Sequence, residues 1–322
     1  MEGVNECRVL SGILKRPLPC QSTCSAPEIT PSFIDDDKLP KGCLIAHTAL
    51  TLIEVQRMAN YFKKPLHRLV KLNRLERSPD MSPDELWDVV LASSLLHDIG
   101  KLADQYVERS KAPPTHLQHH QLSAIKAYKV LSEVFHNNYI ATVAALAILY
   151  HHEALDWRSL DSRALAFSYL RETFTLTKSI NYTINQERLK TFSGNLGEAL
   201  KLLCEEGAIE EGQHDLLLRV LRRASRELLN NKPQSVGEVL SVNNAKRAEF
   251  IVPAFFLYRL LYLADNRAAS ARSRYWLGLL KRVDWRNAEV VAEQIHRALT
   301  QRRYYIGLSA IPEVSMKRKA MS

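Results

Sequence analysis

Apolar residues recur at three- and four-residue spacing through most of this chain from Ala46 onward. This spacing is typical of a helix with one buried face, whereas a half-buried strand would show strict alternation. We see no convincing strands and no internal repeats, so the sequence predicts an all-α fold. The first helix is expected to stop before Pro65, because proline disfavours a helical residue in front of it. The predicted helices cover residues 47–64, 82–100, 119–135, 137–152, 154–174, 194–207, 214–232, 248–273 and 288–303.

The chain is predicted to have three parts. Residues 1–40 are rich in Pro, Cys, Ser and Thr without lasting periodicity, so we expect an irregular N-terminal arm with at most a short extended piece at Cys7–Lys15. Residues 41–270 form the main helical domain, including a helical insertion at about 154–240. Residues 271–322 hold C-terminal helices and a basic tail.

The formal net charge of +9 favours a polyanionic partner, nucleic acid above all. The best candidate for a membrane span, Ile251–Ala264, is short and contains Pro253 and Arg259, so we expect no membrane segment. The first residues also lack the basic start and apolar core of a secretion signal. We therefore expect a cytoplasmic location.

Acids and histidines adjoin apolar runs in several predicted helices. His97 and Asp98 follow the run VVLASSLL. His151 and His152 end the run ATVAALAILY, and Asp265 follows FFLYRLLYLA. A buried carboxylate is costly unless it is paired, hydrogen-bonded or bound to metal. Structural ion networks mostly use Arg or Lys, so the predominance of histidine favours a metal site.

The ligand types indicate the class of metal. Imidazole with carboxylate suits Mn, Fe, Co, Ni or Zn, whereas calcium prefers an all-oxygen shell. Successive helix positions project about 100° apart, so His97 and Asp98 must diverge. His97 could then bind one metal while Asp98 bridges to a second. Two ions roughly 3.5–4 Å apart can activate a water and neutralise a phosphate in the transition state.

The order of these residues resembles the HD superfamily of metal-dependent phosphohydrolases. The paired His151-His152 resembles the CRISPR-associated HD nucleases of type I systems. The resemblance covers roughly residues 41–270 and is carried by HDIGK at 97–101, HHQLSA at 119–124, YHHE at 150–153 and LADNRAAS at 263–270.

This resemblance implies an HD-domain helical bundle that holds one or two divalent ions, namely Mn, Ni, Co, Fe or Mg. The family pattern places a small polar residue four positions after the third ligand, and Ser123 stands four after His119, so His119 is preferred to His120. Asp98 and Lys101 would be the catalytic residues, with Lys101 near the phosphate; a lysine there also suits a helix end. The implied ligands of the first metal are His47, His97, Asp98 and Asp265, and those of the second are Asp98, His119, His151 and His152.

The same resemblance implies a nuclease that cleaves single-stranded DNA, or RNA, with metal-activated water. It would be the cleavage subunit of a type I CRISPR interference complex in antiviral defence. A glycine-rich phosphate-binding loop with Lys and Ser/Thr is missing, so a helicase would be a separate subunit. Arg267, Arg272 and Arg274 follow Asp265 and are predicted to contact the nucleic-acid backbone.

Two other functions stay open. An HD nucleotide phosphohydrolase acting on nucleoside phosphates or cyclic nucleotides would use the same site, but with an enclosed pocket and no need for positive charge. A catalytically silent scaffold should have lost ligands, and none is missing from the pattern. A further basic stripe at residues 219–226 could contact phosphates, although a solvated helix face is the favoured interpretation.

Overall fold

The computed structural model describes residues 5–18, 20, 30–34, 40–73, 80–108, 119–151, 180–230, 232–235 and 248–271. The all-α prediction is confirmed, with one small exception. Strands β1 (Phe33–Ile34) and β2 (Pro40–Lys41) form an antiparallel pair of two residues each, so the prediction of no strands is wrong here. Strands this short give no alternation that a sequence pattern could reveal. The predicted helices at 154–174 and 288–303 lie outside the described residues.

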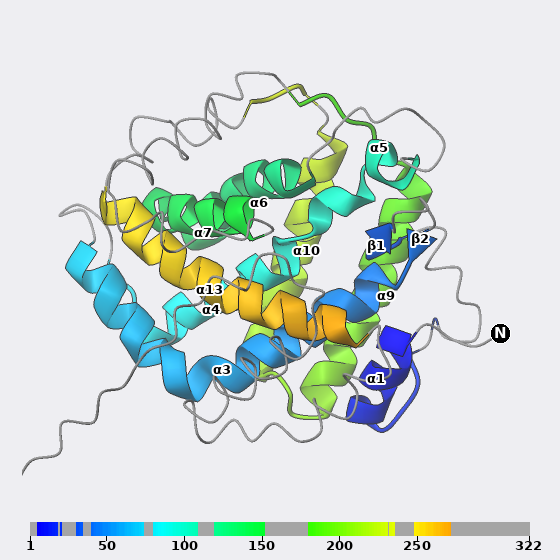
Figure 1. The fold of residues 1–322 in the computed structure, drawn as a ribbon, viewed down its shortest axis with the longest axis horizontal. Helices are drawn as coiled ribbons and strands as arrows, with labels where there is room; N and C mark the ends of the chain where they lie inside the picture. The colour runs from blue at the N-terminus through cyan, green and yellow to red at the C-terminus, as the bar shows by residue number, and fades with distance from the viewer. Residues whose placement is uncertain are drawn as a thin grey trace, which may run out of the picture.

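Five helices form the centre of the molecule (Figure 1). Helices α6 and α7 form a hairpin whose turn contains His136 in a left-handed conformation, and Asn137 caps α7 by accepting a hydrogen bond from the Ile140 amide. Helix α13 packs across α3 and α7. The five helices are α3 (Leu44–Asn73), α4 (Pro83–Leu96), α6 (His119–Phe135), α7 (Asn138–Tyr150) and α13 (Ala248–Ser270).

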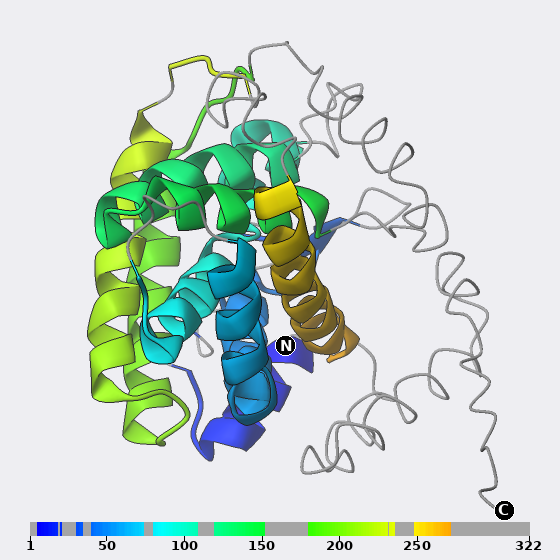
Figure 2. The ribbon, with the colours of Figure 1, turned by 90° about the vertical axis from the view of Figure 1, so that its left-hand side faces the viewer.

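Two long helices, α9 (Gln186–Glu205) and α10 (Glu211–Leu229), line one side of this centre (Figure 2). They come from the predicted insertion at about 154–240. Helix α9 packs on α3, and α10 packs on α4 and α6. Buried leucines of both helices belong to the same apolar cluster as the central bundle. The described part of the predicted insertion therefore shares the core, while the domain boundaries stay a prediction.

The N-terminal arm contains a helix, which the sequence analysis did not predict. Helix α1 (Asn5–Leu14) replaces the expected extended piece and packs on α3. Cys7, Leu10 and Leu14 recur at helical spacing, and each is almost fully buried. The helix has only ten residues, so it needs tertiary packing to be stable.

Helix α3 continues through Pro65, whereas the sequence predicted an end before it. Proline inside a helix removes one hydrogen bond and costs about 3 kcal/mol or more. Leu66 and Val70 follow the proline and are buried, with 2% and 9% of their surfaces exposed. Burying two such side chains contributes about 3–6 kcal/mol, which offsets that cost.

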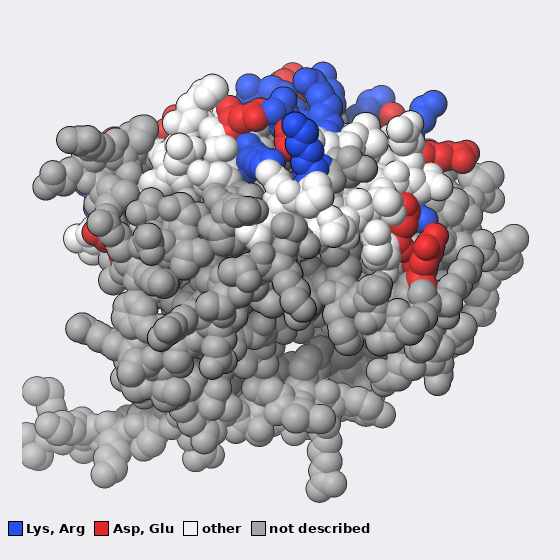
Figure 3. Space-filling view, turned by 90° about the horizontal axis from the view of Figure 1, so that it is seen from above, with Lys and Arg blue, Asp and Glu red and all other residues white. Residues whose placement is uncertain are grey.

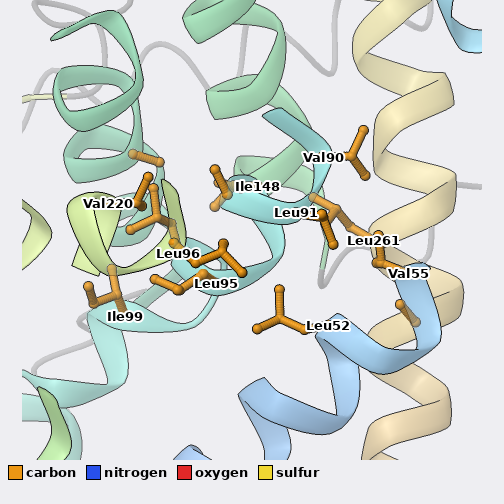
Figure 4. Packing of buried hydrophobic residues seen from close by; sticks show 14 of the residues in the cluster. Leu52, Val55, Val90, Leu91, Leu95, Leu96, Ile99, Ile148, Val220 and Leu261 are labelled. Atoms are coloured by element: carbon orange, nitrogen blue, oxygen red, sulfur yellow. The ribbon is translucent and has the colours of Figure 1, made fainter. Parts of the chain in front are cut away.

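The apolar core lies where α3, α4, α7, α10 and α13 meet (Figure 4). After α4 the chain turns sharply through the 3-10 helix η2 (Ile99–Leu102) into the short α5 (Asp104–Val107). None of the helices in the described ranges has the length and apolar character needed to cross a membrane. The labelled side chains in Figure 4 are Leu52, Val55, Val90, Leu91, Leu95, Leu96, Ile99, Ile148, Val220 and Leu261.

Candidate metal centre

Helix ends bring the candidate ligands together. The start of α4 is fixed by a capping box, in which the Glu85 amide donates to Oγ of Ser82 and the Ser82 amide donates to the Glu85 carboxylate. Its other end therefore delivers His97 and Asp98 at a defined place. The candidates are His47 in the first turn of α3, His97 and Asp98 just after α4, His119 at the start of α6, His151 just after α7, and Asp265 near the end of α13.

The first ligand group surrounds Oδ2 of Asp98. Nε2 of His47 and Nε2 of His97 each lie 3.4 Å from that oxygen. Oδ1 of Asp265 lies 2.8 Å from Nε2 of His47 and 3.6 Å from Nε2 of His97. The four ligand atoms all lie within 4.8 Å of one another, and all four residues are buried.

The second ligand group surrounds the other oxygen of the same carboxylate. Oδ1 of Asp98 lies 3.5 Å from Nε2 of His119 and 3.4 Å from Nε2 of His151. Gly100 allows this approach, because a Cβ there would lie 2.1 Å from the carbonyl oxygen of His119. The Gly100 amide donates to Oγ of Ser123, at 2.9 Å, which fixes η2 against α6. Asp98 is thus shared between two groups.

Backbone contacts orient two of the histidines. Nδ1 of His97 lies 2.6 Å from the carbonyl oxygen of Ser94, and Nδ1 of His151 lies 2.5 Å from that of Ile148. A carbonyl can only accept, so each Nδ1 carries the proton and donates it. Nε2 then faces the cluster and is the nitrogen that a metal would bind.

Lys101 stabilises the charge of Asp98. Its Nζ donates to Oδ2 of Asp98, at 2.5 Å, and to the carbonyl oxygen of Ser32, at 2.9 Å. The ammonium is buried beside the carboxylate, with Lys101 only 5% exposed. We predicted that Lys101 would lie near the phosphate of a substrate. The structure places it against Asp98, and its position near a phosphate stays a prediction.

Burial and neighbouring charges shift the pKa values of this cluster. Burial raises the pKa of Asp98. The opposite effect of Lys101 and the neighbouring histidines is larger in total, so the pKa lies well below its usual range. Burial also raises the pKa of Asp265, and contacts with His47 and His97 reverse this. Burial lowers the pKa of His119 to about 3, so its imidazole is neutral at pH 7. Ionised carboxylates and a neutral imidazole are the forms that bind metal.

The metal-free protein should lose stability as the pH rises from about 6.5 to 10. Burial lowers the pKa of His97, but Asp98 and Asp265 outweigh it and raise the pKa to about 10 from an ordinary 6.5. A raised pKa stabilises the fold fully below the unfolded value, and this contribution is lost toward the folded value. Thermal unfolding in EDTA measures the effect. The unfolding temperature of the His97→Asn variant should change little between pH 6.5 and 10. A wild-type unfolding temperature that rises with pH would contradict the raised pKa of His97.

The donor set fits a divalent transition metal. Among the described residues, Nε2 of His97 and both ring nitrogens of His47 lack a hydrogen bond of acceptable geometry. The 2.8 Å approach of His47 to Asp265 is an electrostatic contact that is poorly aligned for a hydrogen bond. A buried polar atom without a partner costs about 1–3 kcal/mol, and a metal would remove that cost. Imidazole and carboxylate together suit Mn, Fe, Co, Ni or Zn.

Residues 61–188 match the HD domain family. The chain contains an HD domain. The matched range includes His97, Asp98, His119 and His151, which the geometry brings together. His47 and Asp265 lie outside that range, and the structure places them beside His97 and Asp98.

Two known proteins with HD domains are similar to the chain. It is 34% identical over 76 residues to the CRISPR-associated endonuclease Cas3-HD of Pyrococcus furiosus, covering 22% of this chain and 32% of the relative. The chain thus spans about a third of that relative's length. The solved structure of the CRISPR-associated Cas3 HD domain protein from Methanocaldococcus jannaschii is 17% identical, with a TM-score of 0.37. That likeness covers 69% of this chain and 94% of the other.

The remaining predicted ligands of the HD centre have different outcomes. His119 lies in the second ligand group, whereas His120 lies in neither group found among the described residues. His152 lies outside the described residues, so its role stays a prediction. Sequence reasoning missed Glu6 and Ser32, which contact His47 and Lys101. The helical spacing of the apolar residues Cys7, Leu10 and Leu14 was the signal that could have placed the neighbouring Glu6 on a packed helix.

The predicted nucleic-acid contact of Arg267 needs correction. Arg267 is 8% exposed, and its Nε donates to Oε2 of Glu54 at 2.6 Å. A buried guanidinium held in an ion pair is not exposed to a nucleic-acid backbone, and Arg267 instead ties α13 to α3. Arg272 and Arg274 lie outside the described residues.

The basic stripe on α10 is partly neutralised. Arg223 forms ion pairs with Glu133 and Glu227. Figure 3 shows Lys and Arg side chains gathered at one edge of a face, with acidic side chains among them. This mixture favours a solvated helix face over a continuous phosphate track, in agreement with the preferred interpretation of the sequence.

Proposed function

We propose that this chain is a metal-dependent nuclease that cleaves single-stranded DNA. The observation that carries the proposal is the shared Asp98 carboxylate. One of its oxygens faces His47 and His97, and the other faces His119 and His151. Two ligand groups joined by one carboxylate are the arrangement that two-metal phosphodiester hydrolysis needs.

The residues of the centre would have separate roles in metal binding and charge stabilisation. Divalent ions, when bound, would lower the pKa of a water molecule and offset negative charge on the phosphate. Asp98 would be the ligand common to both ions, and His152 is proposed as a further ligand beside His151. Lys101 keeps Asp98 ionised through their 2.5 Å contact. The buried helix ends hold the ligands in place, so little reorganisation would be required during the reaction.

The proposed substrate rests on charge and on the relative. The net charge of +9 suits a polyanion better than a small nucleotide. The similar protein from Pyrococcus furiosus is named an endonuclease and CRISPR-associated. We extend the proposal to a cleavage subunit of a type I CRISPR interference complex, acting with a separate helicase subunit.

Labelled single-stranded DNA should be cut when Mn²⁺, Mg²⁺, Co²⁺ or Ni²⁺ is added, and EDTA should stop the cutting. Gel electrophoresis of the products measures this result, and a double-stranded oligonucleotide of the same sequence tests the strand preference. In parallel assays followed by chromatography, nucleoside triphosphates should release no phosphate and cyclic nucleotides should not open to nucleoside monophosphates. Either reaction without strand cutting would replace the nuclease with an HD nucleotide phosphohydrolase.

A further inference from the structure

Helix α1 brings a fully buried carboxylate, that of Glu6, to the edge of the metal centre. Glu6 and His47 both have 0% exposure, and Oε1 of Glu6 lies 3.8 Å from Nδ1 of His47. A buried carboxylate costs several kcal/mol unless hydrogen bonds and an opposite charge compensate for it. The surroundings of Glu6 are arranged to provide this compensation.

The backbone around Glu6 is built to hold its carboxylate. The amide of Cys43 donates to Oε2 at 2.6 Å, and Oγ of Ser32 lies 3.1 and 3.3 Å from the two carboxylate oxygens. Gly42 adopts a φ of +72°, and a Cβ there would lie 2.5 Å from Oε2 of Glu6 and 2.1 Å from Oγ of Ser32. Glycine is therefore needed at position 42 for the carboxylate to fit.

The Nδ1 atom of His47 faces a different kind of acceptor from the Nδ1 atoms of His97 and His151. His97 and His151 each direct Nδ1 to the carbonyl oxygen three residues earlier. His47 lies in the first turn of α3, and its Nδ1 makes no hydrogen bond of acceptable geometry within the described ranges. The acceptor that faces this nitrogen is Oε1 of Glu6. A carboxylate facing Nδ1 favours a proton on that nitrogen and leaves Nε2 as the ligand atom.

A second path connects Glu6 to the shared carboxylate. Oγ of Ser32 contacts Glu6, and the carbonyl oxygen of the same residue accepts a hydrogen bond from Lys101. Lys101 in turn donates to Asp98. One buried network therefore joins α1 to both His47 and Asp98.

We propose that Glu6 is a positioning residue of the metal centre, holding His47 with Nε2 turned toward Asp98 and Asp265. The N-terminal arm would then help to orient a ligand of the metal centre. This inference rests on the proposed function, because it takes His47 to be a metal ligand.

The Glu6→Gln variant tests the proposal, because it keeps the shape of the side chain and removes its charge. Mn²⁺ binding to the full chain, measured by isothermal titration calorimetry, should weaken about 10- to 100-fold, as for other outer-shell partners of metal ligands. Glu198→Gln on the exposed side of α9 is the matched control and should bind Mn²⁺ as the wild type does. Ser32→Ala removes a contact to Glu6 and should weaken binding in the same direction, which keeps the test available if Glu6→Gln fails to fold.

The Nδ1 proton of His47 separates positioning from a general structural effect. In NMR spectra of the Zn²⁺-loaded protein, assigned with His47→Asn, the signal of this proton should shift in Glu6→Gln, because the carboxylate that faces it has lost its charge. Equal Mn²⁺ affinity of Glu6→Gln and Glu198→Gln would overturn the inference, and so would weaker binding with an unchanged Nδ1 proton signal. If the wild type binds Mn²⁺ and cuts DNA, either result leaves the proposed function standing. A wild type that binds no divalent ion would overturn both.

Discussion

Replacing Asp98 with asparagine should reduce DNA cleavage to background and remove both metal ions. Its two carboxylate oxygens face different ligand groups, so one substitution affects both. The loss in Mn²⁺ affinity should exceed about 100-fold, because substituting outer-shell residues alone costs about 10- to 100-fold. Metal content by mass spectrometry and cleavage of labelled single-stranded DNA measure the two effects.

Two further variants make the Asp98 result specific. Asp265 belongs to the first ligand group and not to the second, so Asp265→Asn should remove one ion and leave the other. Asp215→Asn, at a side chain that is 72% exposed on α10, should leave metal content and cleavage unchanged. Retention of two ions by the Asp98→Asn variant would exclude a shared carboxylate. Equal losses in Asp98→Asn and Asp265→Asn would indicate a single site.

Local sequence patterns predicted the main helices well. The range predicted for α6, 119–135, agrees with the structure, and α7 differs only at its ends. Helix α3 was predicted too short, because the burial of Leu66 and Val70 beyond the proline is a tertiary effect. Helix α1 was missed for a related reason, since its ten residues become helical against α3. Periodicity reports which residues are apolar, and it does not report what they pack against.

Two features of the sequence predicted the candidate centre. The apolar runs beside His97, Asp98, His151 and Asp265 favoured a metal site, and the resemblance to the HD superfamily added His47 and His119 to the same group. Their convergence depends on contacts between residues far apart in the chain, such as His47 with Asp265. Glu6 lies outside the residues that carry the resemblance, so no motif predicted its contact with His47. Arg267 was predicted to contact phosphate because it closely follows Asp265 in the sequence. Its ion pair with Glu54 on another helix could not be seen in the sequence and changes that interpretation.

Replacing Lys101 with methionine should destabilise the metal-free protein by about 3–5 kcal/mol, the typical cost of removing one partner from a buried ion pair. Lys101 and Asp98 are 5% and 1% exposed, so water cannot replace the lost ammonium. Bound Mn²⁺ should restore much of the loss, because a divalent ion supplies the positive charge that Asp98 then lacks. Urea unfolding in EDTA and in saturating Mn²⁺ measures both effects.

Lys201→Met on α9 is the matched control for Lys101→Met. Lys201 is 61% exposed and lies 4.0 Å from Glu205, so this substitution should change stability by less than about 1 kcal/mol. It should also leave the stabilisation by Mn²⁺ unchanged. If Lys101→Met were as stable in EDTA as the control, Lys101 would not be the counter-charge of Asp98. A large loss that Mn²⁺ does not reverse would instead indicate that Lys101 holds η2 in place through Ser32 rather than by neutralising the carboxylate.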